Sequence, residues 1–542
     1  MELHRKNVLL ILLLIVLAGS ALRIYNLGAA SIRADEGGTI YFAERPVQEL
    51  VNIFHPYYDV QPPLFYSILH FWIQAFGKTA FALRLLPALL SIIAIPIIYL
   101  LGKELFNDKI GLFAALIFAI SQANIRFAQT LRMYPLLILF ALLSVYFLMQ
   151  YFKNPSHRNF ALYILFAVLS VYTHYFAGFL LGAEFLFAIL FYKKYGIKFS
   201  KIFPMFAISA ILSAPAGWLL YHQLAIKTYT EVVYFGDDPL AKVTLLAPNQ
   251  SNIFARLGLI FYQLSVGFLQ FNLKSRLFLV VFISSIAVFS LSLIAGIKHM
   301  YYTRREKLWL LLLSVAVPPI CLALLWSLPL NNGHTLIPVL TYTRYLLFIS
   351  PFYYLLVAYG ALEGIPQLVR NIKLQKAAFA IILLAIVFFN AVSLNYYYTL
   401  DSKQENWDAL SSEISKDYSQ GEPIFLLSAS YFYNFEQAFN NSANVYSVPT
   451  NLLLNNATFA DAYRSIRVIN ENNSCDALKM LNEKTKSVWF IDAPITFKSK
   501  PAGMIKDCFL KNGFSAGRVI ENSYFNQKGE NITDMHVYRF EK

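Results

Sequence analysis

Charged residues are scarce in this sequence. Asp, Glu, Lys and Arg make up 14% of the 542 residues, whereas 57% are hydrophobic, and the mean hydropathy is +0.51. So little polar surface cannot cover several soluble cores, which excludes a soluble multidomain protein. The net charge is +14, but the basic residues occur in short clusters between apolar runs, as in cytoplasmic loops. We therefore predict an integral membrane protein that does not bind nucleic acid.

Cysteine is scarcer still. Of the three cysteines, Cys321 lies inside an apolar segment, while Cys475 and Cys508 lie in the polar C-terminal part. These two can form one disulfide if that part is outside the cytoplasm, or remain buried thiols if it is inside. The sequence leaves both alternatives open.

Long apolar runs are abundant. A spanning helix needs about 20 mostly apolar residues, and fewer where neighbouring helices shield its ends. We predict a polytopic α-helical membrane protein with about 11 to 13 transmembrane helices. The eleven candidates are residues 7–25, 81–101, 110–122, 134–151, 160–174, 178–192, 203–222, 279–297, 308–328, 345–362 and 377–395. Two further apolar segments, 62–76 and 254–271, are predicted to lie in or dip into the membrane interface.

The distribution of Lys and Arg predicts the topology. His4, Arg5 and Lys6 place the N-terminus in the cytoplasm, and every second loop after it, predicted to be cytoplasmic, is rich in Lys or Arg. The predicted outer parts are loops 26–80, 123–133, 223–277 and 329–344 and everything after residue 396. Five N-x-[ST] sequons, at Asn249, Asn440, Asn456, Asn472 and Asn531, all fall on this outer side, which supports the topology weakly.

The chain is predicted to have two domains. Residues 1–400 form the transmembrane domain, in which the first outer loop, 26–80, carries an acid pair. Residues 401–542 alternate helical patterns with short apolar strands such as "PIFLLSA", "SVWFIDA", "GRVIENSYF" and "MHVYRF". That alternation predicts an extracytoplasmic α/β domain with a core of its own.

Three groups of polar residues lie at the predicted outer ends of apolar segments. They are Asp35 with Glu36, Arg132 with Tyr134, and Arg344 with Tyr345. Singly, each has an ordinary explanation as a solvated loop, a snorkelling arginine or an interfacial tyrosine. Together they suit a phosphate carried by a lipid, because guanidiniums bind phosphate and a carboxylate accepts a proton or holds a cation.

A histidine metal site is not predicted. The histidines assigned to the outer side are His55, His70, His174 and His334, and their spacing matches no metal signature. Packed or interfacial histidines are commoner than ligands. Arg84, in "FALRLLP", is predicted to anchor its helix.

Several stretches of the sequence resemble a known family. "ADEGGTIYFA", "DVQPPLFYSILHFWIQAFGKTAFALRLLPALLS", "IRFAQTLRMYPLLILFALLS" and "TRYLLFISPFYYLL" are similar to the dolichyl-phosphate-mannose-protein mannosyltransferase and aminoarabinose transferase superfamily, whose members have the GT-C architecture. The resemblance covers roughly residues 7–400. It implies that Asp35 and Glu36 are the catalytic motif and that Arg132, Tyr134 and Arg344 line the site of the carrier phosphate.

The sequence departs from the family pattern at two points. Gln61 replaces the usual histidine before the double proline, so we keep Gln61, together with Tyr345, as a candidate substrate-binding residue without transferring the histidine's role. The WWD motif of oligosaccharyltransferases is missing, which argues against transfer of a whole glycan to asparagine.

The resemblance implies a multi-pass plasma-membrane glycosyltransferase that moves a sugar from a polyprenyl-phosphate donor to a protein, lipid or glycan acceptor at the outer face, with inversion. Asp35 is then the general base, and Glu36 orients groups or binds a divalent cation. Arg132 and Arg344 stabilise the departing phosphate, so we expect no obligatory cofactor or metal, although a divalent cation is compatible with the acid pair. The C-terminal domain is expected to cap the outer cavity or present the acceptor.

Two alternatives remain. A polytopic transporter or lipid flippase could use Asp35, Arg132 and Arg344 as substrate contacts, but transporters usually place such residues near the bilayer midplane within repeated halves. No internal repeat is visible here. A non-catalytic scaffold with an exported working domain is the third hypothesis.

Overall fold

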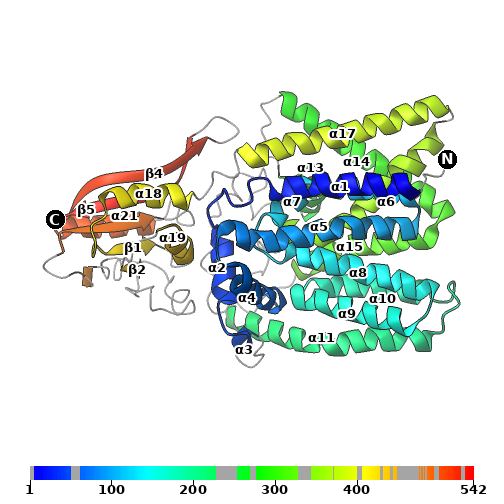
Figure 1. Cartoon of the computed structure of the whole chain (residues 1–542), viewed down its shortest axis with the longest axis horizontal. Helices are drawn as coiled ribbons and strands as arrows, with labels where there is room; N and C mark the ends of the chain where they lie inside the picture. Colours follow the sequence, from blue (N-terminus) through cyan, green and yellow to red (C-terminus); the bar gives the residue numbers. More distant parts are fainter. Residues whose placement is uncertain are drawn as a thin grey trace.

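A computed structural model describes residues 5–50, 61–227, 253–268, 276–326, 343–369, 371–399, 406–427, 431–439, 444–448, 485–492, 500–525 and 531–542, and single positions between 475 and 481. The long helices lie side by side in one bundle, and a sheet lies beyond one end of that bundle (Figure 1). Three short helices, α2 (Ala34–Ala43), α3 (Val47–Leu50) and α4 (Leu64–Phe76), lie between the two.

The bundle consists of long apolar helices and several short helical segments between them. They are α1 (Arg5–Ile24), α5 (Ala80–Leu105), α6 (Asp108–Ile120), α7 (Gln122–Ala128), α8 (Tyr134–Lys153), α9 (His157–Thr173), α10 (Ala177–Phe191), α11 (Phe199–Lys227), α13 (Ile253–Val266), α14 (Arg276–Thr303), α15 (Arg305–Trp326), η1 (Thr343–Ile349), α16 (Ser350–Tyr359), η2 (Gly360–Gly364), η3 (Ile365–Leu368) and α17 (Ile372–Thr399). Each predicted span overlaps one of them, which confirms the polytopic helical fold.

Judged by helix length and apolar composition, fewer spans are found than were predicted. In the described residues eight helices are long and apolar enough to cross a membrane, and the pair α6 and α7, bent by 59°, would make a ninth. Helices α9 and α10, with 17 and 15 residues, coincide with the short predicted spans 160–174 and 178–192. Helix α4, with 13 residues, occupies the segment predicted to lie at the interface.

The predicted cytoplasmic loops share one end of the bundle. There Lys153 pairs with Glu104, and the Nζ of Lys194 lies 2.6 Å from Oε2 of Glu306. At the other end the Nη1 of Arg344 lies 2.6 Å from Oδ2 of Asp35. The loops that carry these two pairs therefore lie at the end opposite Asp35 (Figure 1), while the topology and the end that faces the cytoplasm stay predictions.

Glycines let two helices of the bundle touch backbone to backbone. A Cβ at Gly360 would lie 1.7 Å from the carbonyl oxygen of Ser292, and one at Gly364 would lie 2.6 Å from that of Ala295. Both glycines belong to the π-helical turn η2, which packs against α14. Small residues at such crossings are typical of membrane helices, because the close approach increases van der Waals contact.

The C-terminal part contains a five-stranded sheet of order β2-β1-β3-β5-β4. Its strands are β1 (Ile424–Leu427), β2 (Val445–Val448), β3 (Ser487–Asp492), β4 (Ser515–Phe525) and β5 (Asn531–Glu541). β1 pairs in parallel with β2 and β3, and β5 pairs antiparallel with β3 and β4. The four strands predicted from the sequence are confirmed, and β2 was missed.

Helices α18 (Trp407–Asp417), α19 (Phe432–Ala438) and α21 (Lys500–Lys511) accompany the sheet. Trp407 is fully buried in the same apolar core as Trp489 of β3, with its ring centre 5.4 Å from that of Tyr431. Residues 449–474, most of 475–485 and four of the five sequons lie outside the described residues; Asn531 begins β5.

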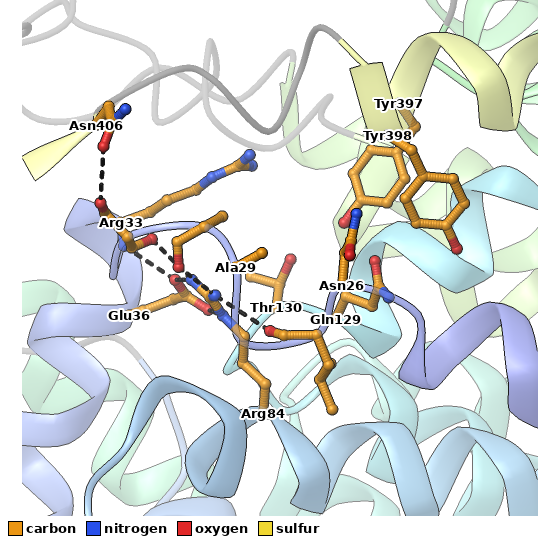
Figure 2. Close-up of a pocket in the computed structure, with 13 residues that line it drawn as sticks. Asn26, Ala29, Arg33, Glu36, Arg84, Gln129, Thr130, Tyr397, Tyr398 and Asn406 are labelled. Carbon is orange, nitrogen blue, oxygen red and sulfur yellow. Dashed lines mark hydrogen bonds and ion pairs between the residues drawn. The ribbon is translucent and has the colours of Figure 1, made fainter. Parts of the chain in front are cut away.

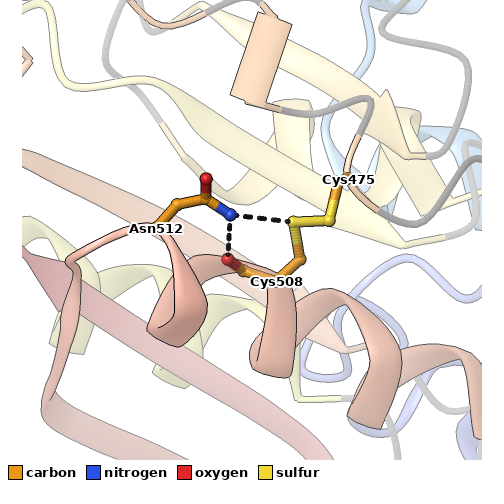
Figure 3. The surroundings of a disulfide bond; sticks show 3 residues. All are labelled: Cys475, Cys508 and Asn512. Atoms are coloured by element: carbon orange, nitrogen blue, oxygen red, sulfur yellow. Dashed lines mark hydrogen bonds between the residues drawn. A yellow bond between two sulfur atoms is a disulfide. The ribbon is translucent and has the colours of Figure 1, made fainter.

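Cys475 and Cys508 form a disulfide, with Cys508 on α21 (Figure 3). The bond selects one of the two alternatives that the sequence left open. Cys321, in α15, is a free cysteine.

Candidate functional site

The first turn of α2 carries both acids of the predicted motif. Successive residues of an α-helix point about 100° apart, so neighbouring side chains face different surroundings. The side chain of Asp35 is 53% exposed, and that of Glu36 is 1% exposed. The two carboxylates therefore belong to two different sites.

The carboxylate of Glu36 accepts four hydrogen bonds. Arg84 donates from Nε to Oε1 at 2.9 Å and from Nη2 to Oε2 at 2.6 Å, while the backbone N–H groups of Arg33 and Leu131 donate at 2.9 and 2.8 Å. Burial alone would raise the pKa of Glu36, but Arg84 and these hydrogen bonds hold it below its usual value. Since both oxygens are engaged, we revise the predicted catalytic or cation-binding role of Glu36 to a positioning role.

Arg84 also folds the linker between α1 and α2. Its Nη1 donates to the carbonyl oxygens of Leu27 and Ala30, at 3.3 and 2.6 Å, and its Nη2 donates to that of Ser31 at 2.8 Å. Figure 2 shows Arg84 and Glu36 facing each other across this linker. In the sequence Arg84 was notable only as an arginine in an otherwise apolar helix. Its partner, Glu36, could not be identified because it lies 48 positions away in the chain.

Asp35 faces the two arginines predicted to bind phosphate. Arg344 makes the ion pair with its carboxylate, and Nη1 of Arg132 donates to the backbone oxygen of Asp35 at 3.3 Å and to Oγ1 of Thr39 at 3.1 Å. Arg344 and Arg132, which follow Asp35 by 309 and 97 positions in the chain, thus both reach the first turn of α2. The structure brings together the acid and both guanidiniums that the sequence singled out.

Three aromatic rings cluster beside Arg344. Its guanidinium lies 5.1 Å from the ring centre of Tyr345, and that ring lies 6.4 Å from Tyr134 and 5.7 Å from His174. Tyr134 begins α8, and His174 follows the last residue of α9. His174 appeared in the sequence only as one of several outward histidines, so this placement is new.

Two polar atoms in this aromatic group are buried without a hydrogen-bond partner among the described residues. They are the hydroxyl oxygen of Tyr134 and Nε2 of His174. The backbone N–H of Phe176 donates to Nδ1 of His174 at 3.2 Å, so in the neutral ring Nε2 carries the proton. Both are donors without an acceptor, which costs about 1–3 kcal/mol each.

Gln61 is placed near the same end of the molecule. It is buried in the turn that precedes α4, and α4 packs against α2. The role of Gln61 in substrate binding stays a prediction. Over the described ranges, no group of three or more His, Cys, Asp or Glu residues could hold a metal ion.

A cavity of about 220 Å³ lies beside Glu36 (Figure 2). Arg33, Glu36 and Arg84 line it, together with Tyr397, at the end of α17, and Asn406, which precedes α18. Asp35 and Arg344 are not among its lining residues. The cavity is therefore distinct from the cluster around Asp35, which we call the outer site and define as Asp35, Arg132, Tyr134, His174, Arg344 and Tyr345.

The outer site has the composition of an anion-binding site with one base. Two guanidiniums and two neutral donors outnumber its single carboxylate, so an anion with several oxygens, such as a phosphate, would satisfy the surplus donors. The exposed carboxylate of Asp35 can accept a proton from a group held beside that anion.

Comparison with known proteins supports the resemblance found in the sequence. Residues 60–221 match the family model described as dolichyl-phosphate-mannose-protein mannosyltransferase. The matching range includes Arg84, Arg132 and His174, but neither Asp35 nor Arg344. No curated protein matches the chain in sequence.

Solved structures share the fold over nearly the whole chain. ArnT from Cupriavidus metallidurans in the apo state has a TM-score of 0.57 at 10% identity, covering 97% of both chains, and ArnT bound to undecaprenyl phosphate has a TM-score of 0.56 at 11% identity, also covering 97% of both. The archaeal oligosaccharyltransferase AglB from Archaeoglobus fulgidus, in complex with an inhibitory peptide and a dolichol-phosphate, has a TM-score of 0.51 at 12% identity and covers 97% of this chain and 74% of AglB. The chain has the fold of GT-C glycosyltransferases.

Proposed function

We propose that this chain is a membrane glycosyltransferase that moves a sugar from a polyprenyl-phosphate donor to a protein, lipid or glycan acceptor, with inversion. The observation that carries the proposal is the meeting of one exposed carboxylate, Asp35, with two guanidiniums, Arg132 and Arg344, at one end of a helical bundle with the GT-C fold. The family match and the undecaprenyl phosphate bound to ArnT agree with a lipid-phosphate donor.

The donor phosphate would replace Asp35 as the partner of Arg344. Charge-assisted hydrogen bonds from Arg132 and Arg344, with Tyr134 and His174 as neutral donors, would hold its oxygens. Release from Arg344 frees the carboxylate of Asp35 to act as a base. The base would thus become available when the donor is in place.

In the transfer step Asp35 takes a proton from the acceptor nucleophile. The nucleophile attacks the anomeric carbon from the face opposite the phosphate. The bond between that carbon and the phosphate oxygen breaks, and its electron pair stays with the departing polyprenyl phosphate. The two guanidiniums stabilise the charge that grows on the leaving oxygen. Since they supply that stabilisation, we propose that no metal is obligatory, although a divalent cation is compatible with the site.

We propose that the outer site faces away from the cytoplasm, in the plasma membrane. The basic loops gathered at the opposite bundle end support this orientation through the positive-inside rule. The disulfide between Cys475 and Cys508 supports it independently, because disulfides persist mainly in oxidising compartments. In this orientation the N-terminus is cytoplasmic, and the C-terminal part with the five-stranded sheet, residues 401–542, which we call the sheet domain, is extracytoplasmic.

The proposal is tested by transfer from radiolabelled polyprenyl-phosphate sugars to extracts of the protein's own membranes, with purified protein in liposomes. We expect transfer by the wild type, with and without chelator, and loss of about 10²-fold or more in Asp35→Asn. Glu49→Gln is the matched control, because Glu49 is an exposed acid on nearby α3 that pairs with Arg45. Equal transfer by Asp35→Asn and wild type, or transport of the lipid without transfer, would overturn the proposal.

A further inference from the structure

Ser31, in the linker before α2, is bound to the sheet domain. Its hydroxyl donates to Oδ2 of Asp408 at 2.6 Å, and the backbone N–H of Asp408 donates back to the same hydroxyl at 3.1 Å. Asp408 is the second residue of α18, whose first N–H groups have no partner inside the helix. A serine of the membrane part therefore caps a helix of the sheet domain.

The next residue is held by a second helix of that domain. Nδ2 of Asn434, which is buried in α19, donates to the carbonyl oxygen of Ile32 at 2.5 Å. Helix α19 also packs directly against α2. Two adjacent linker residues are thus fixed by two helices that lie about 400 positions later in the chain.

The bundle holds the same linker on its other side. Arg84 binds the carbonyl oxygen of Ser31 and the carboxylate of Glu36, and Glu36 accepts the backbone N–H of Arg33 at the start of α2. Only two residues separate Ile32 from Asp35. A shift of the sheet domain would therefore move the first turn of α2 unless these bonds break.

We propose that the sheet domain positions Asp35 for reaction, and that Ser31, Asp408 and Asn434 are positioning residues that act through the start of α2. This inference rests on the proposed function. It assigns the domain a role in setting the distance between the base and the phosphate site, in addition to any role toward the acceptor. Misplacing a catalytic group by about 1 Å can slow a reaction by about 10²-fold. The bonds that hold the linker on both sides therefore affect the rate by fixing the position of Asp35.

The junction contains the room that such a movement needs. The cavity beside Glu36 is lined by Ser31 and Arg33 of the linker and by Asn406, which precedes α18. Without the bond between Ser31 and Asp408, this polar space would let the domain and the linker separate. The arginines of the outer site belong to other parts of the chain: Arg344 lies in η1, and Arg132 lies just before α8.

The test compares Ser31→Ala, Asp408→Ala and their double variant with wild type in the transfer assay. We expect kcat to fall about 10- to 100-fold while the KM for the donor changes less than twofold, because Arg132 and Arg344 stay in place. The double variant should lose no more than the worse single variant, since both remove the same bond. Ser31→Thr, which keeps the hydroxyl, should restore at least half of the wild-type kcat.

Asp417→Asn is the matched control, because Asp417 ends the same helix and pairs with Arg518 on β4. It should leave kcat and KM within twofold of wild type. Unchanged kcat in Ser31→Ala and Asp408→Ala, additive losses in the double variant, or an equal loss in Asp417→Asn would overturn the positioning role.

Hydrogen–deuterium exchange separates this inference from the proposed function. Amides in the first turn of α2 should exchange at least fivefold faster in Ser31→Ala than in wild type, whereas those of α8 should not change. This measurement needs no transfer activity, so it decides the question of positioning even if the wild type transfers nothing. Unchanged exchange in α2 would overturn the inference.

Discussion

At the scale of single residues, two neighbouring carboxylates have separate tasks. Asp35 is exposed and faces Arg344, whereas Glu36 is buried and satisfied by Arg84 and two backbone N–H groups. The sequence predicted that this pair is special, but not the division between its members. That division depends on Arg84 and Leu131, which come from distant parts of the chain and are brought close only by folding.

Replacing Glu36 tests the buried ion pair. Glu36→Gln leaves Arg84 charged and buried without its counter-charge, which should lower the free energy of unfolding by about 3–5 kcal/mol. Thermal unfolding in detergent at pH 7 measures this loss, and Glu49→Gln is the exposed control. Equal stability of Glu36→Gln and wild type would contradict the assigned role.

The pH dependence of this loss has a definite sign. The folded-state pKa of Glu36 lies below its ordinary value of 4.5, so its contribution to stability is fully present above about pH 4.5. It is lost as the pH falls through the folded-state pKa. The stability difference between wild type and Glu36→Gln should therefore be constant from pH 7 to pH 5 and shrink in more acidic buffer.

Two buried tyrosines make a matched pair. Tyr134→Phe removes a buried hydroxyl without a partner among the described residues, so it should raise stability by about 1 kcal/mol while weakening binding of polyprenyl phosphate. Tyr163→Phe removes a hydroxyl that donates to Glu184 at 2.8 Å, so it should lower stability by about 1–3 kcal/mol without affecting binding. Unfolding and lipid-phosphate titrations on both variants check this contrast; the same direction of stability change in both would refute it.

At the scale of elements, α1 and the bent pair α6 and α7 cap each other. Arg23 of α1 is fully buried, and its Nη1 and Nη2 donate to the carbonyl oxygens of Ala119 and Phe118, at 2.8 and 3.2 Å, where α6 ends. Gln129, which follows α7, donates in return to the carbonyl oxygen of Arg23 at 2.9 Å. A guanidinium suits the negative end of a helix, and these bonds satisfy carbonyl groups that the bend exposes.

Arg23→Met should therefore lower the free energy of unfolding by at least about 2 kcal/mol, because several buried carbonyl oxygens lose their donors. Arg158→Met, at an exposed position at the start of α9, is the control and should change stability by less than about 0.5 kcal/mol. Denaturation in detergent compares the two, and a neutral Arg23→Met would show that the carbonyl groups find other partners.

Hydropathy was sufficient to predict the helices, because length and apolar composition decide what crosses a bilayer. It was not sufficient to predict α7. The predicted span 110–122 ends close to the break at Ser121, but the segment predicted as the outer turn 123–133 contains most of a second helix, which the side chain of Ser121 caps. The bend depends on long-range donors such as Arg23, and no local pattern in the sequence contains them.

At the scale of the whole molecule, a helical bundle and a sheet domain meet around α2. Alternating apolar strands predicted the sheet, and four of its strands were found. β2 was missed because its sequence, VYSV, is less apolar than the equally short IFLL of β1, and because it is held by parallel pairing with β1. His174 was not chosen as a site residue because its proximity to Tyr345 arises from the packing of α8 against both α9 and η1.

The cysteines test the placement of the sheet domain. In denatured but unreduced protein, a maleimide should modify one cysteine, Cys321, and after reduction it should modify all three. Reduction should also destabilise the sheet domain by about 3–4 kcal/mol, because the bond closes a loop of 33 residues. Limited proteolysis with and without reductant measures that effect. Three reactive thiols without reduction would contradict an oxidising location.

The most direct test of the central claim measures binding and chemistry in one variant. Polyprenyl phosphate is titrated into wild type and Asp35→Asn, and single-turnover transfer is then measured at saturating donor. The account predicts equal or tighter lipid-phosphate binding in Asp35→Asn, because Arg344 is released, with transfer slower by about 10²-fold or more. Transfer at the wild-type rate in Asp35→Asn would contradict the assignment of Asp35 as the base.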